Sequence, residues 1–322
     1  MAGNQVRSTF EPAWWLTNPH LQTIWPYLFR HTRAPELAHE RLELPDGDFV
    51  DLCLTPNTGK PVVAVFHGLE GSIRSPYAAA IMAAVHQRGW RGVFMHFRGC
   101  SGTPNRLERA YHSGDTGDIE YLVQTLKQRF PHLPLGIVGY SLGGNALLKY
   151  LGTSIDASIA AAVAISVPYL LHDSTQQLSR GLSQYYQRRL VSSLKDKLRR
   201  KFTGRNTTLP LDRLDQIQTF YQFDDAITAP LHGFSGADDY YTRSSSRQYL
   251  HSIRVPTLLI HAQDDPFMTP ASIPDANELP DNVMLEVSTH GGHVGFIGGR
   301  YPWKPVYWLE QRIIDSLEPW LT

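Results

Sequence analysis

The 322-residue sequence contains little cysteine: its two cysteines, Cys53 and Cys100, lie in separate segments without a C-x-x-C partner. Two isolated cysteines do not indicate a disulfide framework or a cysteine-based zinc site. The sequence also has no run of about 18 apolar residues that could span a bilayer, and its N-terminus lacks the basic and then apolar layout of a signal peptide. These absences predict a cytoplasmic protein.

Net charge is absent too, because 30 Lys and Arg residues balance 30 Asp and Glu residues. A neutral chain has no overall electrostatic attraction for nucleic acid or an anionic membrane, so neither is predicted as its main partner. The acidic pairs Asp224-Asp225 and Asp238-Asp239 have no histidine nearby at ligand spacing and are interpreted as helix caps and turns. We therefore predict no metal and no other cofactor, and the sequence leaves the oligomeric state open.

The sequence does contain a regular alternation of apolar strand runs and helical stretches. A hairpin is predicted at 41–54, around a Pro-Asp-Gly turn, and a last amphipathic helix around 306–317. The alternation predicts an α/β protein with a mostly parallel, eight-stranded sheet and helices on both faces. The other predicted strands are apolar runs of the kind buried on both faces: 62–66, 92–97, 135–139, 159–167, 256–262 and 283–288.

The strand pattern is interrupted over residues 168–254, where charged helical stretches replace the apolar runs. We predict a helical cap inserted above the carboxyl edge of the sheet, within a single domain of residues 1–322. Residues 1–35, rich in Trp and Pro, are predicted to form an extension of loop and short helix over the body. The cap residues predicted to line a pocket recur at helical spacing: Leu178, Leu182, Tyr185, Tyr186 and Leu190.

The most informative stretch is 135–151, where an apolar strand is followed by Gly139-Tyr140-Ser141-Leu142-Gly143 and then by a helix. A serine in a G-x-S-x-G turn takes a strained conformation that exposes its hydroxyl, and the glycines let the backbone approach closely. The helix N-terminus beside it favours a developing negative charge. Ser141 is therefore the candidate nucleophile. A second stretch, Gly233-Phe234-Ser235-Gly236-Ala237, follows no apolar strand and is predicted to be a loop.

An activated serine needs a histidine as general base, and that histidine needs a carboxylate to orient it. Asp264 and Asp265 directly follow the strand predicted at 256–262, and His290 and His293 follow the last predicted strand. The chain order is therefore Ser, Asp, His, which is the order of an α/β sheet with a nucleophile turn. Spacing leaves the choice within each pair open.

An oxyanion hole needs two backbone N–H donors. The first predicted donor is Leu142, directly after the serine, and the second is Leu69, in the loop after a buried strand. His67, His96 and Arg98 also lie at strand ends near this position, and we interpret them as residues that support the loops.

Eight blocks spread over nearly the whole chain are informative together: NPHLQTIWP, HGLEGSIRSPY, FRGCSGTPN, YHSGDTGDI, GYSLGGN, FDDAITAPLHGF, AQDDPFMTP and GGHVGF. In these blocks the sequence resembles the YheT-like esterases of the α/β-hydrolase superfamily. The resemblance implies the α/β-hydrolase fold and ester hydrolysis, and it assigns the nucleophile to Ser141, the acid to Asp265 and the base to His293. The group is related to membrane-anchored eukaryotic lipases, whose apolar anchor this sequence lacks.

The sequence thus predicts a serine hydrolase that cleaves small-molecule carboxylic esters with short-to-medium acyl chains through an acyl-enzyme. Two alternatives are a non-catalytic module that binds a ligand on the same fold and an acylglycerol lipase whose cap helix docks on lipid. In the second case, residues 190–202 would lie on a membrane surface with Leu190, Leu194 and Leu198 inward. Zero net charge favours a solvated lid helix instead.

Overall fold

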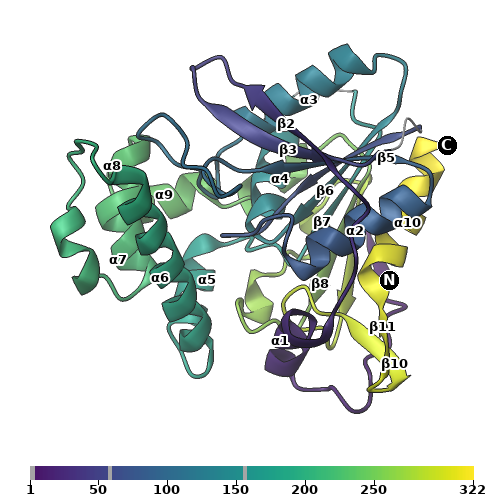
Figure 1. The fold of residues 1–322 in the computed structure, drawn as a ribbon. Coiled ribbons are helices and arrows are strands. Elements are labelled where there is room, and N and C mark those ends of the chain that lie inside the picture. Colours follow the sequence, from purple (N-terminus) through teal and green to yellow (C-terminus); the bar gives the residue numbers. More distant parts are fainter. Residues whose placement is uncertain (1–3, 57–59, 155–157) are drawn as a thin grey trace.

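The computed structural model describes residues 4–56, 60–154 and 158–322. Its centre is a nine-stranded sheet with the order β1-β9-β8-β7-β6-β4-β5-β3-β2 (Figure 1). Neighbouring strands are parallel except for the β2–β3 and β3–β5 pairs. The strands are β1 (Gln5–Arg7), β2 (Ala38–Glu43), β3 (Phe49–Leu54), β4 (Val62–Phe66), β5 (Arg91–His96), β6 (Leu135–Tyr140), β7 (Ala161–Ile165), β8 (Thr257–Ala262) and β9 (Val283–Ser288).

The predicted α/β architecture is confirmed, with one more strand than the eight expected. The additional strand is β1, which has three residues and pairs in parallel with β9 at the sheet edge. A separate hairpin of β10 (Ile297–Tyr301) and β11 (Lys304–Tyr307) precedes the last helix. These segments are too short and too polar to give a period of alternating apolar residues, so the sequence pattern does not indicate them.

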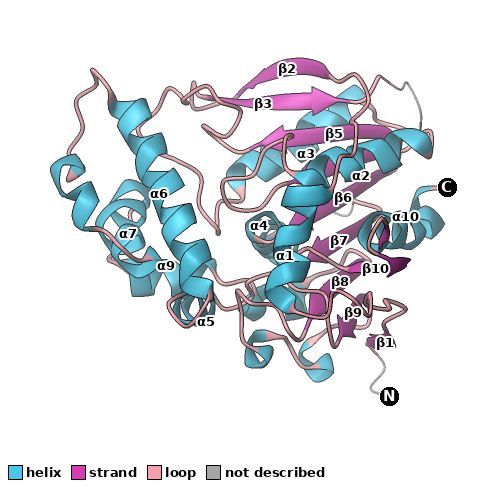
Figure 2. Ribbon diagram, turned by 60° about the horizontal axis from the view of Figure 1, so that its bottom comes forward, coloured by secondary structure: helices cyan, strands magenta, loops and turns pink. Residues whose placement is uncertain are grey.

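Helices cover both faces of the sheet (Figure 2). The alternation of side chains along β4 explains why, since Ala64 and Phe66 belong to one apolar core and Val63 and Val65 to the other. The first core is closed by α3 and α4, and the second by α2 and α10. Their bounds are α2 (Pro76–Gln87), α3 (Gly117–Arg129), α4 (Leu142–Thr153) and α10 (Trp308–Leu321).

The segment between β7 and β8 is helical in the described structure, and Figure 1 shows α6 to α9 gathered beside the sheet. Most of this segment shares an apolar core of its own, which includes Val191, Leu214 and Ile227, whereas α9 packs in a separate cluster with Leu171. The elements are α5 (Leu171–Leu178), α6 (Ser183–Phe202), η1 (Leu211–Gln216), α7 (Phe220–Phe223), the π-helical turn η2 (Asp224–Thr228), α8 (Ala229–His232), α9 (Ala237–Ser244) and η3 (Arg247–Ser252). Two short 3₁₀ turns, η4 (Pro270–Ser272) and η5 (Ala276–Glu278), follow β8.

The prediction of one continuous apolar face in the cap is wrong for two of its residues. Leu178 and Leu190 line a cavity and Tyr186 is buried, but Leu182 and Tyr185 are 71% and 60% exposed. The reason is a break in the helix after α5, with Gly181 at φ 49°, so that α6 restarts in a different phase. A helical period counted across that break assigns these two side chains to the wrong side.

The N-terminal region contains α1 (Pro19–Phe29), whose first turn is capped by Asn18. Gln22 on this helix is fully buried, and its side chain donates to the carbonyl groups of Leu16 and Ile297 and accepts from the Ile297 N–H. These bonds fasten α1 to the C-terminal part of the chain. Among the described residues, no helix has the length and apolar character needed to cross a bilayer.

Candidate active site

Ser141 lies at the sharp turn between β6 and α4, with φ 50° and ψ −119°. A positive φ in a non-glycine residue is strained and is retained only where the surroundings enforce it. The two flanking glycines explain the enforcement, because a Cβ at Gly139 would lie 2.7 Å from the Gly144 Cα and one at Gly143 would overlap the His67 carbonyl oxygen. The chain therefore packs tightly around a serine hydroxyl that faces the loops.

His293 and Asp265 lie in line with this serine. The Nε2 atom of His293 is 2.9 Å from Ser141 Oγ, and its Nδ1 atom is 2.8 Å from Asp265 Oδ2. An imidazole that donates its Nδ1–H to the carboxylate presents a lone pair at Nε2 to the serine hydroxyl. The structure thus brings together three predicted site residues from three separate loops, and contacts in this order can activate a serine for attack on a carbonyl carbon.

Two residues that were not predicted from the sequence, Phe267 and Thr23, hold the imidazole and its carboxylate partner in place. The ring of Phe267 stacks on the ring of His293, with centroids 4.0 Å apart and planes 3° from parallel. The backbone N–H of Phe267 also donates to Asp265 Oδ1 at 2.8 Å, and the backbone N–H of His293 donates to Thr23 Oγ1 on α1 at 2.9 Å. The sequence offered one indication of the role of Phe267: it lies two residues after Asp265, in the block AQDDPFMTP.

The other members of the two pairs, Asp264 and His290, contact each other instead. His290 Nδ1 is 3.2 Å from Asp264 Oδ2, and the Gly292 N–H donates to Asp264 Oδ1 at 2.9 Å. Burial raises the pKa of Asp264, although the hydrogen bonds from Gly292 and His290 oppose this. This second carboxylate–imidazole contact joins the loop after β8 to the loop after β9, and among the described residues neither side chain hydrogen-bonds to Ser141.

The two residues predicted to supply the oxyanion donors lie near the serine. Leu69 and Leu142 line the same cavity as Ser141. Within the described ranges, neither backbone N–H donates a hydrogen bond to another group of the chain. The loop before Leu69 runs close to the serine, because a Cβ at Gly68 would lie 3.1 Å from the Ser141 Cβ. Both N–H groups are therefore unused within the described part of the chain.

His67 supports this loop rather than facing the cavity. The backbone N–H of Phe97 donates to His67 Nε2 at 3.0 Å, so the ring proton is on Nδ1, 2.6 Å from the carbonyl oxygen of Gly68. Burial lowers the pKa of His67 to about 3, which keeps the ring neutral. Arg98 has a related role, because it forms buried ion pairs with Asp48 and Asp118. These contacts agree with the interpretation of His67 and Arg98 as residues that support the loops.

A cavity of about 130 Å³ opens beside Ser141 and His293, beneath the helices of the 168–254 segment. Its wall is mainly apolar, with Leu178, Leu190 and Leu194 among the contributors from that segment. For scale, an apolar cavity of about 150 Å³ holds a benzene ring. In the described part of the chain, no three His, Cys, Asp or Glu side chains are grouped so as to hold a metal ion.

The chain is similar in sequence to known proteins. A family model described as "alpha/beta hydrolase fold" matches residues 61–299. A protein of Escherichia coli (strain K12) named "Putative esterase YheT" is 46% identical, over 97% of this chain and 94% of its own length. A Saccharomyces cerevisiae protein named "Monoacylglycerol lipase" is 31% identical, over 77% of this chain and 57% of its own.

Solved structures agree at the level of the fold. A Pyrococcus furiosus esterase, Pf2001, superimposes with a TM-score of 0.61 at 17% sequence identity, over 91% of this chain and 99% of its own. At that identity the likeness concerns the arrangement of strands and helices alone.

Proposed function

Because the chain belongs to the α/β-hydrolase family, we propose that it cleaves carboxylic esters with Ser141 as nucleophile, His293 as general base and Asp265 as the orienting acid. Family membership and sheet topology confirm the predicted fold class and the resemblance to YheT-like proteins. The chain is thereby identified as a hydrolase with esterase and lipase relatives. The specific reaction and the roles of these three residues are our proposal.

The observation that best supports this mechanism is the continuous Ser141–His293–Asp265 contact, at 2.9 and 2.8 Å. In the first step, His293 Nε2 takes the hydroxyl proton as Ser141 Oγ attacks the ester carbonyl carbon. The N–H groups of Leu69 and Leu142 stabilise the oxyanion, and His293 returns the proton to the leaving alcohol. Water, activated by the same imidazole, then attacks the acyl-enzyme and releases the acid.

The cavity suggests which esters are cleaved best. We propose that residues 168–254 act as a cap on a single domain of residues 1–322, with residues 1–35 as an N-terminal extension, and that the acyl chain lies against the cap. Each buried CH₂ contributes about 0.8 kcal/mol until the wall is reached. Along a p-nitrophenyl ester series, kcat/KM of the wild-type protein should therefore rise over short-to-medium chains and then fall sharply.

The same series, run with Ser141→Ala, separates turnover at the proposed site from background hydrolysis. A kcat/KM that still climbs at long acyl chains would contradict the limited pocket and favour an open, lipase-like site. No turnover of any ester by the folded wild type would favour the non-catalytic ligand-binding module.

A lipid-docking lipase is the second candidate, because apolar side chains are exposed near the cavity-forming helices. On α1, Tyr27, Leu28 and Phe29 are 60%, 59% and 55% exposed, and Leu182 and Tyr185 are exposed at the start of α6. Apolar groups of this kind can insert into a membrane interface, and the basic residues of α6 would add a salt-sensitive attraction to anionic lipid. Binding of the protein to anionic vesicles that is lost at high salt would support this candidate, and the cytoplasmic location remains a prediction.

A further inference from the structure

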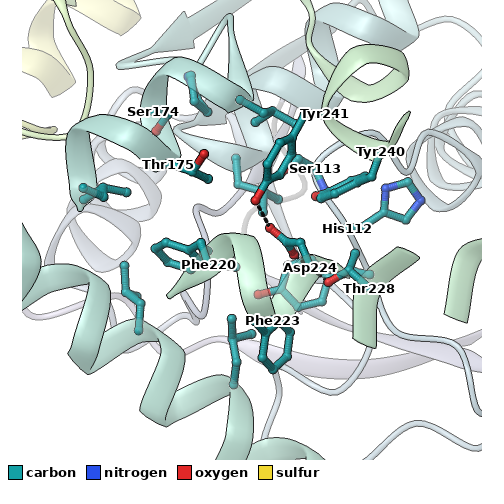
Figure 3. Close-up of a pocket in the computed structure, with 18 of the residues that line it drawn as sticks. His112, Ser113, Ser174, Thr175, Phe220, Phe223, Asp224, Thr228, Tyr240 and Tyr241 are labelled. Carbon is teal, nitrogen blue, oxygen red and sulfur yellow. Dashed lines mark hydrogen bonds between the residues drawn. The ribbon is translucent and has the colours of Figure 1, made fainter. Parts of the chain in front are cut away.

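Part of the cavity lining is polar, in contrast to its mainly apolar wall. Asp224, in the π-helical turn η2, lines the cavity, where its Oδ1 accepts from Thr228 Oγ1 at 2.6 Å and its Oδ2 from Tyr241 Oη at 2.8 Å (Figure 3). Its neighbour Asp225 behaves as the sequence predicted, because its carboxylate accepts from the Ala237 N–H at the start of α9. Only Asp224 turns inward, and π-helical turns are frequent at functional sites.

Asp224 keeps hydrogen-bonding capacity that the chain does not use. A carboxylate has about four lone-pair sites, and the two hydroxyl donors occupy two of them. No Lys or Arg among the described residues forms an ion pair with Asp224. Burial raises the pKa of this carboxyl to about 6, against the effect of both hydrogen bonds, so it is mostly ionised at neutral pH. The cavity therefore contains a carboxylate that can accept a further hydrogen bond.

His112, which lines the same cavity, supplies a hydrogen-bond donor. The Gly114 N–H donates to His112 Nδ1 at 3.2 Å, and burial lowers the pKa of His112 to about 3, so the neutral ring carries its proton on Nε2. In the described structure this Nε2–H has no acceptor within the chain. The ring of His232 packs beside it, with centroids 4.4 Å apart, and Nε2 of His232 is buried without a hydrogen-bond partner among the described residues. Such unmatched polar groups are uncommon and call for a ligand or water.

We propose that Asp224 and His112 form a polar subsite that binds a hydroxyl group of the substrate, in the cavity that Ser141 also lines. A hydroxyl donates to the Asp224 carboxylate and accepts from the His112 N–H at once, whereas an ammonium group has no lone pair for His112 and a carboxylate group is repelled by Asp224. The inference rests on the proposed function, since it takes the substrate to be an ester whose carbonyl lies at Ser141 in the same cavity.

The test uses four esters that share one skeleton: propyl hexanoate, 3-hydroxypropyl hexanoate, propyl 6-hydroxyhexanoate and propyl 6-aminohexanoate. For the wild type, one hydroxylated ester should exceed propyl hexanoate in kcat/KM by about 10- to 100-fold, the range for a hydrogen bond to a charged group. Which ester it is shows whether the hydroxyl belongs to the alcohol or the acyl half. The result is expressed as the ratio of kcat/KM for the hydroxylated ester to kcat/KM for propyl hexanoate. A change that affects the chemical step of both esters equally cancels in this ratio.

Asp224→Asn should reduce this ratio to about 1, and His112→Phe, which keeps the ring and removes the N–H, should reduce it several-fold. Asp212→Asn is the matched control, because Asp212 is an exposed acid of the same segment outside the cavity, and it should keep the wild-type ratio. A thermal unfolding curve for each variant shows whether it is folded. An unchanged ratio in folded Asp224→Asn or His112→Phe, no hydroxyl preference in the wild type, or a preference for the amino ester would overturn the proposal.

Binding of the intact esters to Ser141→Ala, measured by calorimetry, distinguishes a failure of the subsite from a failure of the esterase mechanism. If no ester is cleaved but the hydroxylated ester binds more tightly, and Asp224→Asn abolishes the difference, the subsite is supported and the esterase mechanism fails. If all the esters are cleaved equally well and bind equally, the mechanism stands and the subsite is wrong.

Discussion

Replacing Ser141 with alanine is expected to lower kcat for the best ester substrate by about 10⁶-fold, the order found when the nucleophile of a comparable triad is removed. The alanine cannot form the acyl-enzyme, so only weak background catalysis by the oxyanion donors would remain. The variant should fold normally, because alanine meets the same positive φ as the serine it replaces. Steady-state kinetics measure the effect, after the rate of ester hydrolysis without protein has been subtracted.

Ser235→Ala is the matched control, since Ser235 lies in the second glycine-flanked stretch but on an exposed loop. It should retain wild-type kcat. Activity of folded Ser141→Ala within about tenfold of the wild type would contradict the assignment of the nucleophile, as would a large loss in Ser235→Ala.

The second large effect is expected for Asp265→Asn, which should lower kcat by about 10⁴-fold. The imidazole of His293 would lose the negative charge that fixes its tautomer and stabilises the imidazolium formed when it takes the serine proton. Asp265 is 3% exposed, and its replacement by the isosteric amide preserves packing. Single-turnover kinetics on a chromogenic ester separate this loss in the chemical step from changes in product release.

Asp264→Asn provides an adjacent control of identical chemistry. Its carboxylate contacts His290 and the Gly292 N–H rather than His293, so we expect a loss of less than about tenfold. If Asp264→Asn has the larger effect and Asp265→Asn the smaller, the choice between the two carboxylates is wrong.

The residues around the nucleophile were predictable because their signal is local. An apolar strand, a G-x-S-x-G turn and an apolar helix follow each other within one short stretch, and the structure has β6, Ser141 and α4 in that order. The choice within Asp264/Asp265 and His290/His293 could not be made from spacing. Adjacent residues in a loop point in different directions, and which one points toward Ser141 depends on contacts made across the fold, such as those of Asp264 with the loop after β9.

Other features depend on segments that are distant in sequence. Thr23 reaches the His293 backbone from α1, and Phe267 stacks on its ring; neither contact has a local pattern. The polar subsite is a similar case. The block FDDAITAPLHGF was visible in the sequence, but only the folded chain brings Asp224 next to Tyr241 and into the cavity that His112 also lines.

The most direct test of the central claim is covalent labelling with a fluorophosphonate probe, followed by peptide mass spectrometry of the modified site. The probe reacts with a serine that has both an activating base and an oxyanion hole. We predict a single labelled peptide that carries the phosphonyl group on Ser141, and no labelled peptide in Ser141→Ala. Label on Ser235 or another serine of the wild type, or labelling of Ser141→Ala at the wild-type level, would contradict the account.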